Sequence, residues 1–355
     1  IDDAWNETRY YGVNFSSYAE LDFGQFWEPL KGVKWRTNLG AQYRNSRVGS
    51  YYGEGYTNPF KNPAMAPNVA NNEHSQKLSW TLENLLYINK TIKDIHSVNI
   101  TLLQSAERYR TEGLNMRGYE ITFPSSLWYN IGASNNAKYA PGSNFSTWSR
   151  ASYMARVNYG LMDKYLLTVT GRWDGASMLA VGNKWDFFPS AALAWRISDE
   201  PFMKDLVWLD NLKLRVGYGK TGNSAVSPYQ TKGQLALRHY VFNNGSSEYI
   251  GYAPSVMAND QLTWETTDQW NVGVDFGFLK NRINGTVEFY LQNTKDLLLK
   301  RQLPVVSGFS SVMSNVGSTR NKGIEITLNT RNIMNRNFTW STDLTFSANK
   351  EEIVE

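Results

Sequence analysis

The chain has 355 residues, a formal net charge of +4 and no cysteine, which excludes disulfides and thiolate metal sites. The charge is too small, and the lysines and arginines are too dispersed, for a nucleic-acid-binding face. Hydrophobic residues reach only 41%, yet 13 Trp and 21 Tyr are present, and these residues favour places where an apolar surface meets water. No run of about 18 apolar residues occurs, so a transmembrane helix is excluded, whereas a membrane-spanning sheet is not.

The two ends of the chain lead us to expect an internal fragment of a longer protein. The chain begins at Ile1 without an initiator Met or a signal peptide. It ends at Glu355, directly after a strand-like segment.

Alternation of apolar and polar residues predicts about twelve strands, because successive side chains of a strand point to opposite faces of the sheet. One short helix is expected around residues 125–132. The predicted strands are 9–26, 33–44, 75–91, 95–111, 150–159, 164–174, 187–197, 212–220, 262–278, 282–295, 320–330 and 337–349.

The predicted connections alternate between short turns and long polar loops. The longest predicted loops are residues 45–74, 112–147 and 221–261. In an up-and-down membrane barrel, short turns lie on the periplasmic side and long loops lie outside the cell. The predicted strands are also longer than the usual five to six residues of globular sheets. Loop order and strand length therefore favour an all-β, antiparallel, transmembrane barrel.

The two faces of the predicted sheet differ in polarity. In the strand near residue 270, Trp270, Val272 and Val274 alternate with Asn271 and Gly273. A sheet in lipid needs one apolar face and no unpaired backbone edge, while the inner face can be wet. The alternative is a soluble antiparallel sheet with one buried face.

Several short motifs after the predicted strands resemble those of one family. The motifs are Asp174-Gly175-Ala176-Ser177, Phe188-Pro189-Ser190, Trp195-Arg196-Ile197-Ser198-Asp199-Glu200-Pro201-Phe202, Leu212-Lys213-Leu214-Arg215, Gly217-Tyr218-Gly219-Lys220-Thr221-Gly222-Asn223, Leu262-Thr263-Trp264-Glu265, Asn271-Val272-Gly273-Val274-Asp275, Asn315-Val316-Gly317 and Asn321-Lys322-Gly323-Ile324-Glu325. Together they resemble the barrel of the SusC/RagA-type TonB-dependent transporters of Bacteroidetes. The similarity spans most of the chain and is densest from Ser149 to Glu355.

The resemblance implies a cell outer-membrane barrel of about 22 strands around an N-terminal plug. It implies a SusD-like surface lipoprotein as a lid, energy from TonB–ExbB–ExbD, and oligosaccharide or peptide ligands. Residues 1–355 would then belong wholly to the barrel domain, with about twelve of its strands. We find no TonB box, plug or closing C-terminal strands in the sequence. We therefore expect that this piece alone does not transport and that it exposes two sheet edges.

No enzyme, cofactor or metal site is predicted. Gly217-Tyr218-Gly219-Lys220-Thr221 lacks the first glycine and the following helix of a phosphate loop. The three histidines have no ligand spacing, and no nucleophile or zinc motif of the common hydrolases occurs. We therefore expect no catalytic, cofactor-binding or metal-binding residues.

Aromatic residues in the predicted long loops are the candidate contacts for a ligand or for the lid protein. Sugars stack on aromatic rings, whereas the alternative roles are packing between loops and an aromatic girdle at the membrane. The candidates are Tyr51, Tyr52, Tyr56, Trp128, Tyr129, Tyr229, Tyr240, Phe242 and Tyr249.

The function expected from these features is TonB-dependent import of an oligosaccharide, or of a peptide, with a lid lipoprotein. One alternative is a siderophore- or vitamin-type receptor that has no lid. Another, from a different class, is a soluble, aromatic-rich, carbohydrate-binding β-domain.

Overall fold

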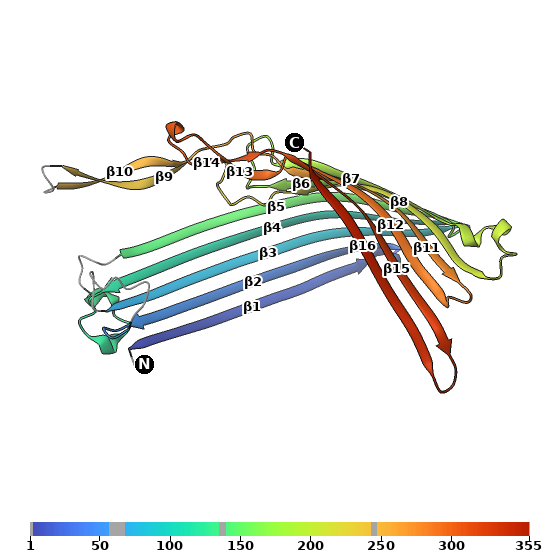
Figure 1. Cartoon of the computed structure of the whole chain (residues 1–355), viewed down its shortest axis with the longest axis horizontal. Coiled ribbons are helices and arrows are strands. Elements are labelled where there is room, and N and C mark those ends of the chain that lie inside the picture. The colour runs from blue at the N-terminus through green and yellow to red at the C-terminus, as the bar shows by residue number, and fades with distance from the viewer. Residues whose placement is uncertain (1–2, 57–67, 135–139, 243–246, 355) are drawn as a thin grey trace. The chain divides into compact units, whose positions relative to one another are not determined.

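The structure is a computed structural model that describes residues 3–56, 68–134, 140–242 and 247–354 (Figure 1). Within these ranges, twelve strands form one antiparallel sheet, and each strand lies beside its neighbour in chain order. The strands are β1 (Ala4–Asp22), β2 (Val33–Tyr52), β3 (Val69–Ile92), β4 (His96–Tyr119), β5 (Ala140–Leu161), β6 (Tyr165–Ala176), β7 (Trp185–Arg196), β8 (Leu209–Asn223), β11 (Glu265–Phe278), β12 (Ile283–Lys295), β15 (Ser318–Met334) and β16 (Thr339–Ile353). The predicted all-β class and all twelve predicted strands are confirmed.

Two hairpins interrupt the order of the large sheet. They are β9 (Gln234–Phe242) with β10 (Ser247–Val256), and β13 (Leu298–Gln302) with β14 (Ser311–Asn315). No strand was predicted at either place, between residues 221 and 261 or between 295 and 320, and this prediction is wrong. Both strands of the first hairpin carry apolar side chains on both faces, so an alternating pattern is absent.

The helical segments among the described residues are single 3-10 turns. The helix predicted around 125–132 is wrong, because two such turns stand there instead. In the order of the chain the turns are η1 (Phe23–Gln25), η2 (Glu28–Leu30), η3 (Pro124–Ser126), η4 (Ile131–Ala133), η6 (Ile197–Asp199), η7 (Pro201–Met203) and η9 (Val305–Ser307). Among the described residues, no helix is long and apolar enough to cross a membrane.

The connections fall into two sets at opposite ends of the strands. We call the end that carries residues 224–264 and 296–317 the long-loop end, and the other end the short-turn end. The predicted alternation of lengths is largely confirmed. The exception is the β6–β7 connection, residues 177–184, which is shorter than the β7–β8 connection, residues 197–208.

Strands β2 to β5 extend further toward the long-loop end than predicted. β2 continues to Tyr52 and β3 begins at Val69, so the predicted loop 45–74 is mostly strand. β4 likewise continues to Tyr119, inside the predicted loop 112–147. Polar residues occupy both faces of these extensions, so the periodic signal fades although backbone pairing continues.

The register confirms the predicted division between the two faces. Trp270 pairs with Tyr218 and Val272 with Val216, while Asn271 and Gly273 point to the opposite side. We call these the apolar face and the wet face. Trp270 is 51% exposed, and exposure of so large an apolar ring on a sheet face is typical of a surface that meets lipid.

Aromatic residues mark both margins of the apolar face. On β6, Tyr165 and Trp173 stand eight residues apart, and on β11 the same spacing separates Trp270 from Phe278. Eight residues span about 26 Å along a strand. That length is of the order of the apolar band of outer-membrane barrels, which is about 25 Å tall.

The chain forms two compact units. The first comprises Ile1–Ala19, Thr37–Glu83 and Ala106–Ser149, and the second comprises Glu20–Arg36, Asn84–Ser105 and Arg150–Glu355. The core of the first unit is a buried cluster of Tyr51, Ala70, Ile121, Trp128 and Ile131. The first unit thus holds parts of β1 to β5, and the second holds the rest of these strands together with β6 to β16, both hairpins included.

Candidate functional site

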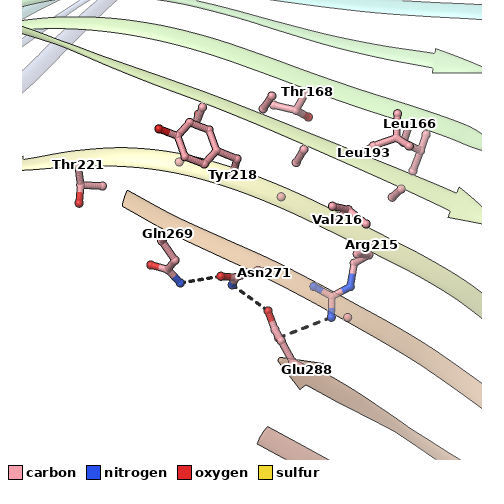
Figure 2. A pocket seen from close by; sticks show the side chains of 17 residues that line it. Leu166, Thr168, Leu193, Arg215, Val216, Tyr218, Thr221, Gln269, Asn271 and Glu288 are labelled. Carbon is pink, nitrogen blue, oxygen red and sulfur yellow. Dashed lines mark hydrogen bonds and ion pairs between the residues drawn. The ribbon is translucent and has the colours of Figure 1, made fainter. Parts of the chain in front are cut away.

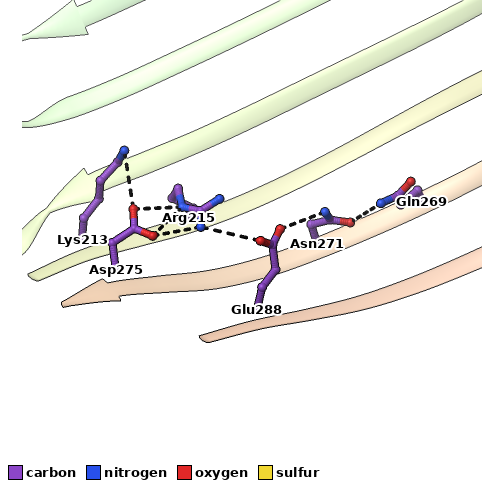
Figure 3. A network of polar contacts seen from close by, with 6 residues as sticks. All are labelled: Lys213, Arg215, Gln269, Asn271, Asp275 and Glu288. Carbon is purple, nitrogen blue, oxygen red and sulfur yellow. Dashed lines mark hydrogen bonds and ion pairs between the residues drawn. The ribbon is translucent and has the colours of Figure 1, made fainter. Parts of the chain in front are cut away.

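A chain of polar contacts crosses the wet face of β8, β11 and β12 (Figure 3). Arg215 donates from Nη2 to Asp275 Oδ1 at 2.9 Å and from Nε to Asp275 Oδ2 at 3.1 Å. Lys213 Nζ lies 3.8 Å from the same carboxylate, and Arg215 Nη2 lies 3.8 Å from Glu288 Oε2. Asn271 Nδ2 donates to Glu288 Oε1 at 3.1 Å. Charged groups are thus held in fixed positions on a face that the sequence predicted to be wet.

An open groove of about 480 Å³ lies beside this polar network (Figure 2). Its floor includes Ala192, Gly217 and Gly219, whose small or absent side chains leave the backbone accessible. Gln269 lies on its margin and donates from Nε2 to Asn271 Oδ1 at 2.8 Å. The groove therefore offers amide, carboxylate and guanidinium groups to a polar ligand on the wet face.

Three connections at the long-loop end of the second unit pack into an ordered platform. Leu179, Leu262 and Val312 come from different connections, and all three are buried. Trp264 is also buried, and its Nε1 donates to the Lys184 carbonyl at 3.1 Å. We call this assembly the loop platform.

Side chains that bind backbone groups join the segments of the loop platform. Asn315 accepts from the Thr263 amide at 2.9 Å and donates to the Thr263 carbonyl at 3.0 Å. Glu265 accepts from Asn223 Nδ2 at 3.1 Å and from the Leu298 amide at 3.0 Å. Several motifs that carry the family resemblance therefore serve to hold the loops together.

Gly222 allows two aromatic rings to pack directly against the β8 backbone. A Cβ at Gly222 would lie 2.2 Å from the Phe188 ring and 2.9 Å from the Trp264 ring. The two rings meet edge to face, with centroids 5.3 Å apart. A larger residue at position 222 would separate β8 from the platform.

The nine aromatic candidates lie in different environments, and five of them belong to strands rather than loops. Tyr51 and Tyr52 belong to β2, which continues into the predicted loop 45–74, while Tyr240 and Tyr249 face each other across the β9–β10 hairpin, inside the predicted connection 221–261. Phe242 is the last residue of β9, and its ring meets that of Tyr249 edge to face at 5.7 Å.

Two of the candidates belong to the core of the first unit. Tyr51 is 5% exposed and Trp128 is 4% exposed. A Cβ at Gly49 would lie 2.1 Å from the Trp128 ring, so the ring packs directly on the β2 backbone. Burial raises the pKa of the Tyr51 hydroxyl. These two side chains hold η3 and η4 against the strands.

The other candidates present accessible rings. Tyr52 and Tyr56 stack with centroids 5.2 Å apart, and Tyr129 is exposed. Tyr229 is exposed and has a left-handed backbone with a φ of 66°. Tyr240, Phe242 and Tyr249 are 48%, 55% and 60% exposed. Their contact with a ligand or partner stays a prediction.

A buried carboxylate organises the short-turn end of β6 and β7. Glu200 Oε1 accepts from the Tyr165 hydroxyl at 2.6 Å and from Trp195 Nε1 at 3.1 Å. Lys164 Nζ lies 3.2 Å from Glu200 Oε2. These contacts, the bond from Tyr165 foremost, lower the pKa of Glu200 below its ordinary value. The ionised carboxylate fixes the rings of Tyr165 and Trp195, which stack at 6.3 Å.

The polar network could not be predicted from the sequence, because it depends on the register between β8 and β11. Alternation along each strand puts Arg215 and Asp275 on the wet face, but only the pairing of Arg215 with Gly273 brings them together. A slip of one residue would put Arg215 on the apolar side. Opposite charges on two neighbouring strands were the available signal. In the described part of the chain, no three His, Cys, Asp or Glu residues form a group that could hold a metal ion.

Known proteins similar to the chain agree with the fold. The family model of the TonB dependent receptor-like beta-barrel matches residues 2–352. TonB-dependent receptor P26 of Formosa agariphila is 36% identical over 276 residues, which cover 78% of this chain and 28% of that protein. TonB-dependent receptor SusC of Bacteroides thetaiotaomicron is 40% identical over 212 residues, which cover 58% of this chain and 21% of that protein.

The fold also matches a solved structure. The RagAB peptide importer in its "closed-closed" state superposes with a TM-score of 0.88 at 22% identity, over 99% of this chain and 37% of that chain. The chain thus spans between 21% and 37% of the length of these three proteins. The soluble alternative does not agree with this family, whose members are outer-membrane proteins. The chain belongs to the TonB-dependent receptors and forms part of their outer-membrane β-barrel.

Proposed function

We propose that the protein containing this chain imports an oligosaccharide across the outer membrane, with energy from TonB–ExbB–ExbD. A SusD-like surface lipoprotein covers the long-loop end. A peptide is the alternative ligand class. The proposal is supported by family membership, by the similarity to SusC, and by the fold shared with the RagAB peptide importer.

The observation that carries the proposal is that the second unit combines the loop platform with the polar network on its wet face. Buried side chains such as Leu262 and Trp264 fix the loop platform. The β9–β10 hairpin extends from this platform, so both ends of the hairpin are held in place. The hairpin carries Tyr240, Phe242 and Tyr249 on one side. Aromatic rings stack on the C–H faces of sugars, and the network around Arg215 offers hydrogen bonds to hydroxyl groups.

The mechanism needs no covalent chemistry. The ligand is captured at the long-loop end, enclosed by the lipoprotein, and passed along the wet face once TonB has acted on the rest of the protein. Fixed polar groups on that face replace hydrogen bonds that the ligand loses from water. The apolar face keeps this part of the barrel in the membrane throughout.

The test is ligand-dependent growth of a strain that lacks the full-length gene. Growth should fail on one class of oligosaccharide and return with the wild-type gene. Complementation with Tyr240→Ala, Phe242→Ala and Tyr249→Ala combined should restore growth poorly at low ligand concentration. Each stacking contact of this kind contributes about 1 kcal/mol, so loss of all three should lower the uptake affinity by roughly 100-fold.

The matched control is Phe289→Ala, which removes an exposed ring from the apolar face. This control should grow like the wild type. Loss of growth only under iron limitation would replace the proposal with a siderophore-type receptor, and loss only on peptides would replace the ligand class.

A further inference from the structure

Tyr109 and Trp148 form an aromatic pair where β4 and β5 lie side by side in the first unit (Figure 1). Their ring centroids lie 5.6 Å apart, and their planes differ by 17°. Thr147 Oγ1 donates to the Tyr109 carbonyl at 3.0 Å, which ties the two strands together at this level. Both rings are half-buried, so part of each stays accessible.

The pair belongs to the wet face. A Cβ at Gly160 on β5 would lie 3.6 Å from Ser97 Cβ on β4 and 3.4 Å from Leu166 Cδ2, and Leu166 lines the groove on the wet face. Tyr109 lies twelve residues from Ser97, and Trp148 lies twelve residues from Gly160. Because twelve is an even number, side chains at both ends of each interval point to the same face.

The opposite face of the same two strand segments is different in character. Leu114 and Phe145 are exposed there, and the Arg110 guanidinium lies over the Phe145 ring at 5.2 Å. The contacts between β4 and β5 thus fall into two separate sets, one on each face. The aromatic pair is not part of the surface that carries Phe145.

Two amides lie on the wet face beyond the rings, toward the ends of the strands. A Cβ at Gly113 would lie 2.6 Å from Asn144 Oδ1, and a Cβ at Gly142 would overlap the Asn115 amide. Each glycine therefore lets an amide of the neighbouring strand lie directly over the backbone. An amide offers two N–H donors and a carbonyl acceptor, so the two groups can bind hydroxyls of a ligand in either sense.

The wet-face surface between the rings and the amides is uncharged. On β4 it lies between the charged residues Glu107 and Arg117. Its positions are Tyr109, Thr111, Gly113 and Asn115 on β4, and Gly142, Asn144, Ser146 and Trp148 on β5. Aromatic rings, hydroxyls and amides are the groups that recognise neutral sugars, whereas an anionic ligand would need cationic partners at these positions.

We propose that Tyr109 and Trp148, with Asn115 and Asn144 beyond them, form a binding subsite for a neutral oligosaccharide. The amides lie four to six residues from the rings, or roughly 13–20 Å along a strand, which is long enough for several sugar units. A sugar ring stacks on the aromatic pair, and the units that follow it bond to the amides. The inference rests on the proposed import function and names a contact in the first unit, apart from the groove and the hairpin of the second.

The test is titration calorimetry on the full-length protein, purified from native outer membranes in mild detergent with whatever partner it retains. The probes are maltohexaose, cellohexaose, xylohexaose and an inulin-type fructan. The wild type should bind one of them. Tyr109→Ala combined with Trp148→Ala should weaken that binding by at least about tenfold, since each stacking contact contributes about 1 kcal/mol. Trp148→Phe should keep most of the affinity, because a ring remains at that position.

The matched control is Phe145→Ala, which removes an exposed ring from the opposite face of β5. This control should bind the sugar as the wild type does. Equal affinity in the double variant and the wild type would overturn the subsite and leave the import function standing. A wild type that binds none of the four sugars would count against the oligosaccharide as ligand class, and the subsite would fall with it.

A partner contact at the same surface would give a different result. If the double variant lost a co-purifying protein together with the sugar, the surface would be assigned to that protein and the proposal would be overturned. Heat-modifiable migration on gels verifies that every variant is folded.

Discussion

The guanidinium of Arg215 and the carboxylate of Asp275 meet across β8 and β11 through three hydrogen bonds between 2.9 and 3.2 Å. The two residues are not register partners, because Arg215 pairs with Gly273 and reaches diagonally over it. A Cβ at Gly273 would lie 3.0 Å from Arg215 Nη2, so the glycine leaves room for the guanidinium. This diagonal contact anchors the polar network on the wet face.

Arg215→Met and Asp275→Asn should therefore be coupled. The pair is partly exposed, with side chains 34% and 20% accessible, so we expect a coupling free energy of about 1 kcal/mol rather than the larger values of buried pairs. The measurement is a double-mutant cycle in urea on the full-length protein in detergent. The single-contact pair Lys220–Asp186 should give a smaller value, and a coupling of zero for Arg215 would contradict the geometry.

Gly222→Ala should destabilise the loop platform by about 1–3 kcal/mol, because the new methyl group would overlap the Phe188 and Trp264 rings. Limited proteolysis of the connection 224–264 and the unfolding midpoint would both report the change. Gly219→Ala is the control, since its Cβ would lie 3.5 Å from Ser190 in ordinary contact. Equal effects at the two glycines would show that backbone freedom matters more than the ring contact.

Glu200→Gln should destabilise the protein in a pH-dependent way. The folded-state pKa of Glu200 lies below its ordinary value of 4.5, so the carboxylate stabilises the fold above that value. This contribution is lost as the pH falls through the lowered pKa. The difference in unfolding midpoint between wild type and variant should be largest near neutral pH and shrink in acid. Asp199→Asn, at the neighbouring exposed carboxylate, should change little, and a difference that grows in acid would refute the assignment.

Two substitutions in the turn between β3 and β4 should stabilise the protein. Lys93 and Asp94 have φ values of 54° and 55°, in the left-handed region that Asn and Gly adopt more readily. Lys93→Asn with Asp94→Gly should stabilise the protein by about 1 kcal/mol. Gly32→Ala should do the opposite, because its φ is 86° and its Cβ would lie 2.1 Å from the Asn89 carbonyl oxygen. Urea unfolding of both variants checks the two signs.

Sidedness can be tested with single cysteines, because this chain contains none of its own. Val241→Cys on the β9–β10 hairpin should react with an impermeant maleimide on intact cells. Lys280→Cys in the short turn should react only after the outer membrane is opened. The full-length protein must first have any other cysteine replaced. The reverse pattern would place the long-loop end in the periplasm.

The strands could be predicted from the sequence wherever lipid imposes a contrast between the two faces. β11 alternates Trp270, Val272 and Val274 with Asn271 and Gly273, and its predicted end at 278 matches the structure. Beyond the lipid the contrast is lost, so the outer ends of β2 to β5 and the β9–β10 hairpin were missed. Pairing of backbone groups continues there without a pattern in the side chains.

The site was predictable only in part, because sequence indicates residue type but not register or burial. The rings of Tyr51 and Trp128 were grouped with accessible aromatics, yet η3 and η4 fold over them. Conversely, Arg215, Asp275 and Glu288 are charged strand residues, and residue type alone singles out none of them. Their joint role follows from pairings between strands that are as many as 60 positions apart in the chain.

The most direct test of the proposed function is the composition of the complex around the full-length protein. The protein would be purified from native outer membranes in mild detergent, and its partners would be identified and counted by mass spectrometry. We predict one surface lipoprotein per receptor, released together with an oligosaccharide or a peptide. A receptor that purifies alone from these membranes, and that still restores growth in cells without any such lipoprotein, would contradict the lidded importer.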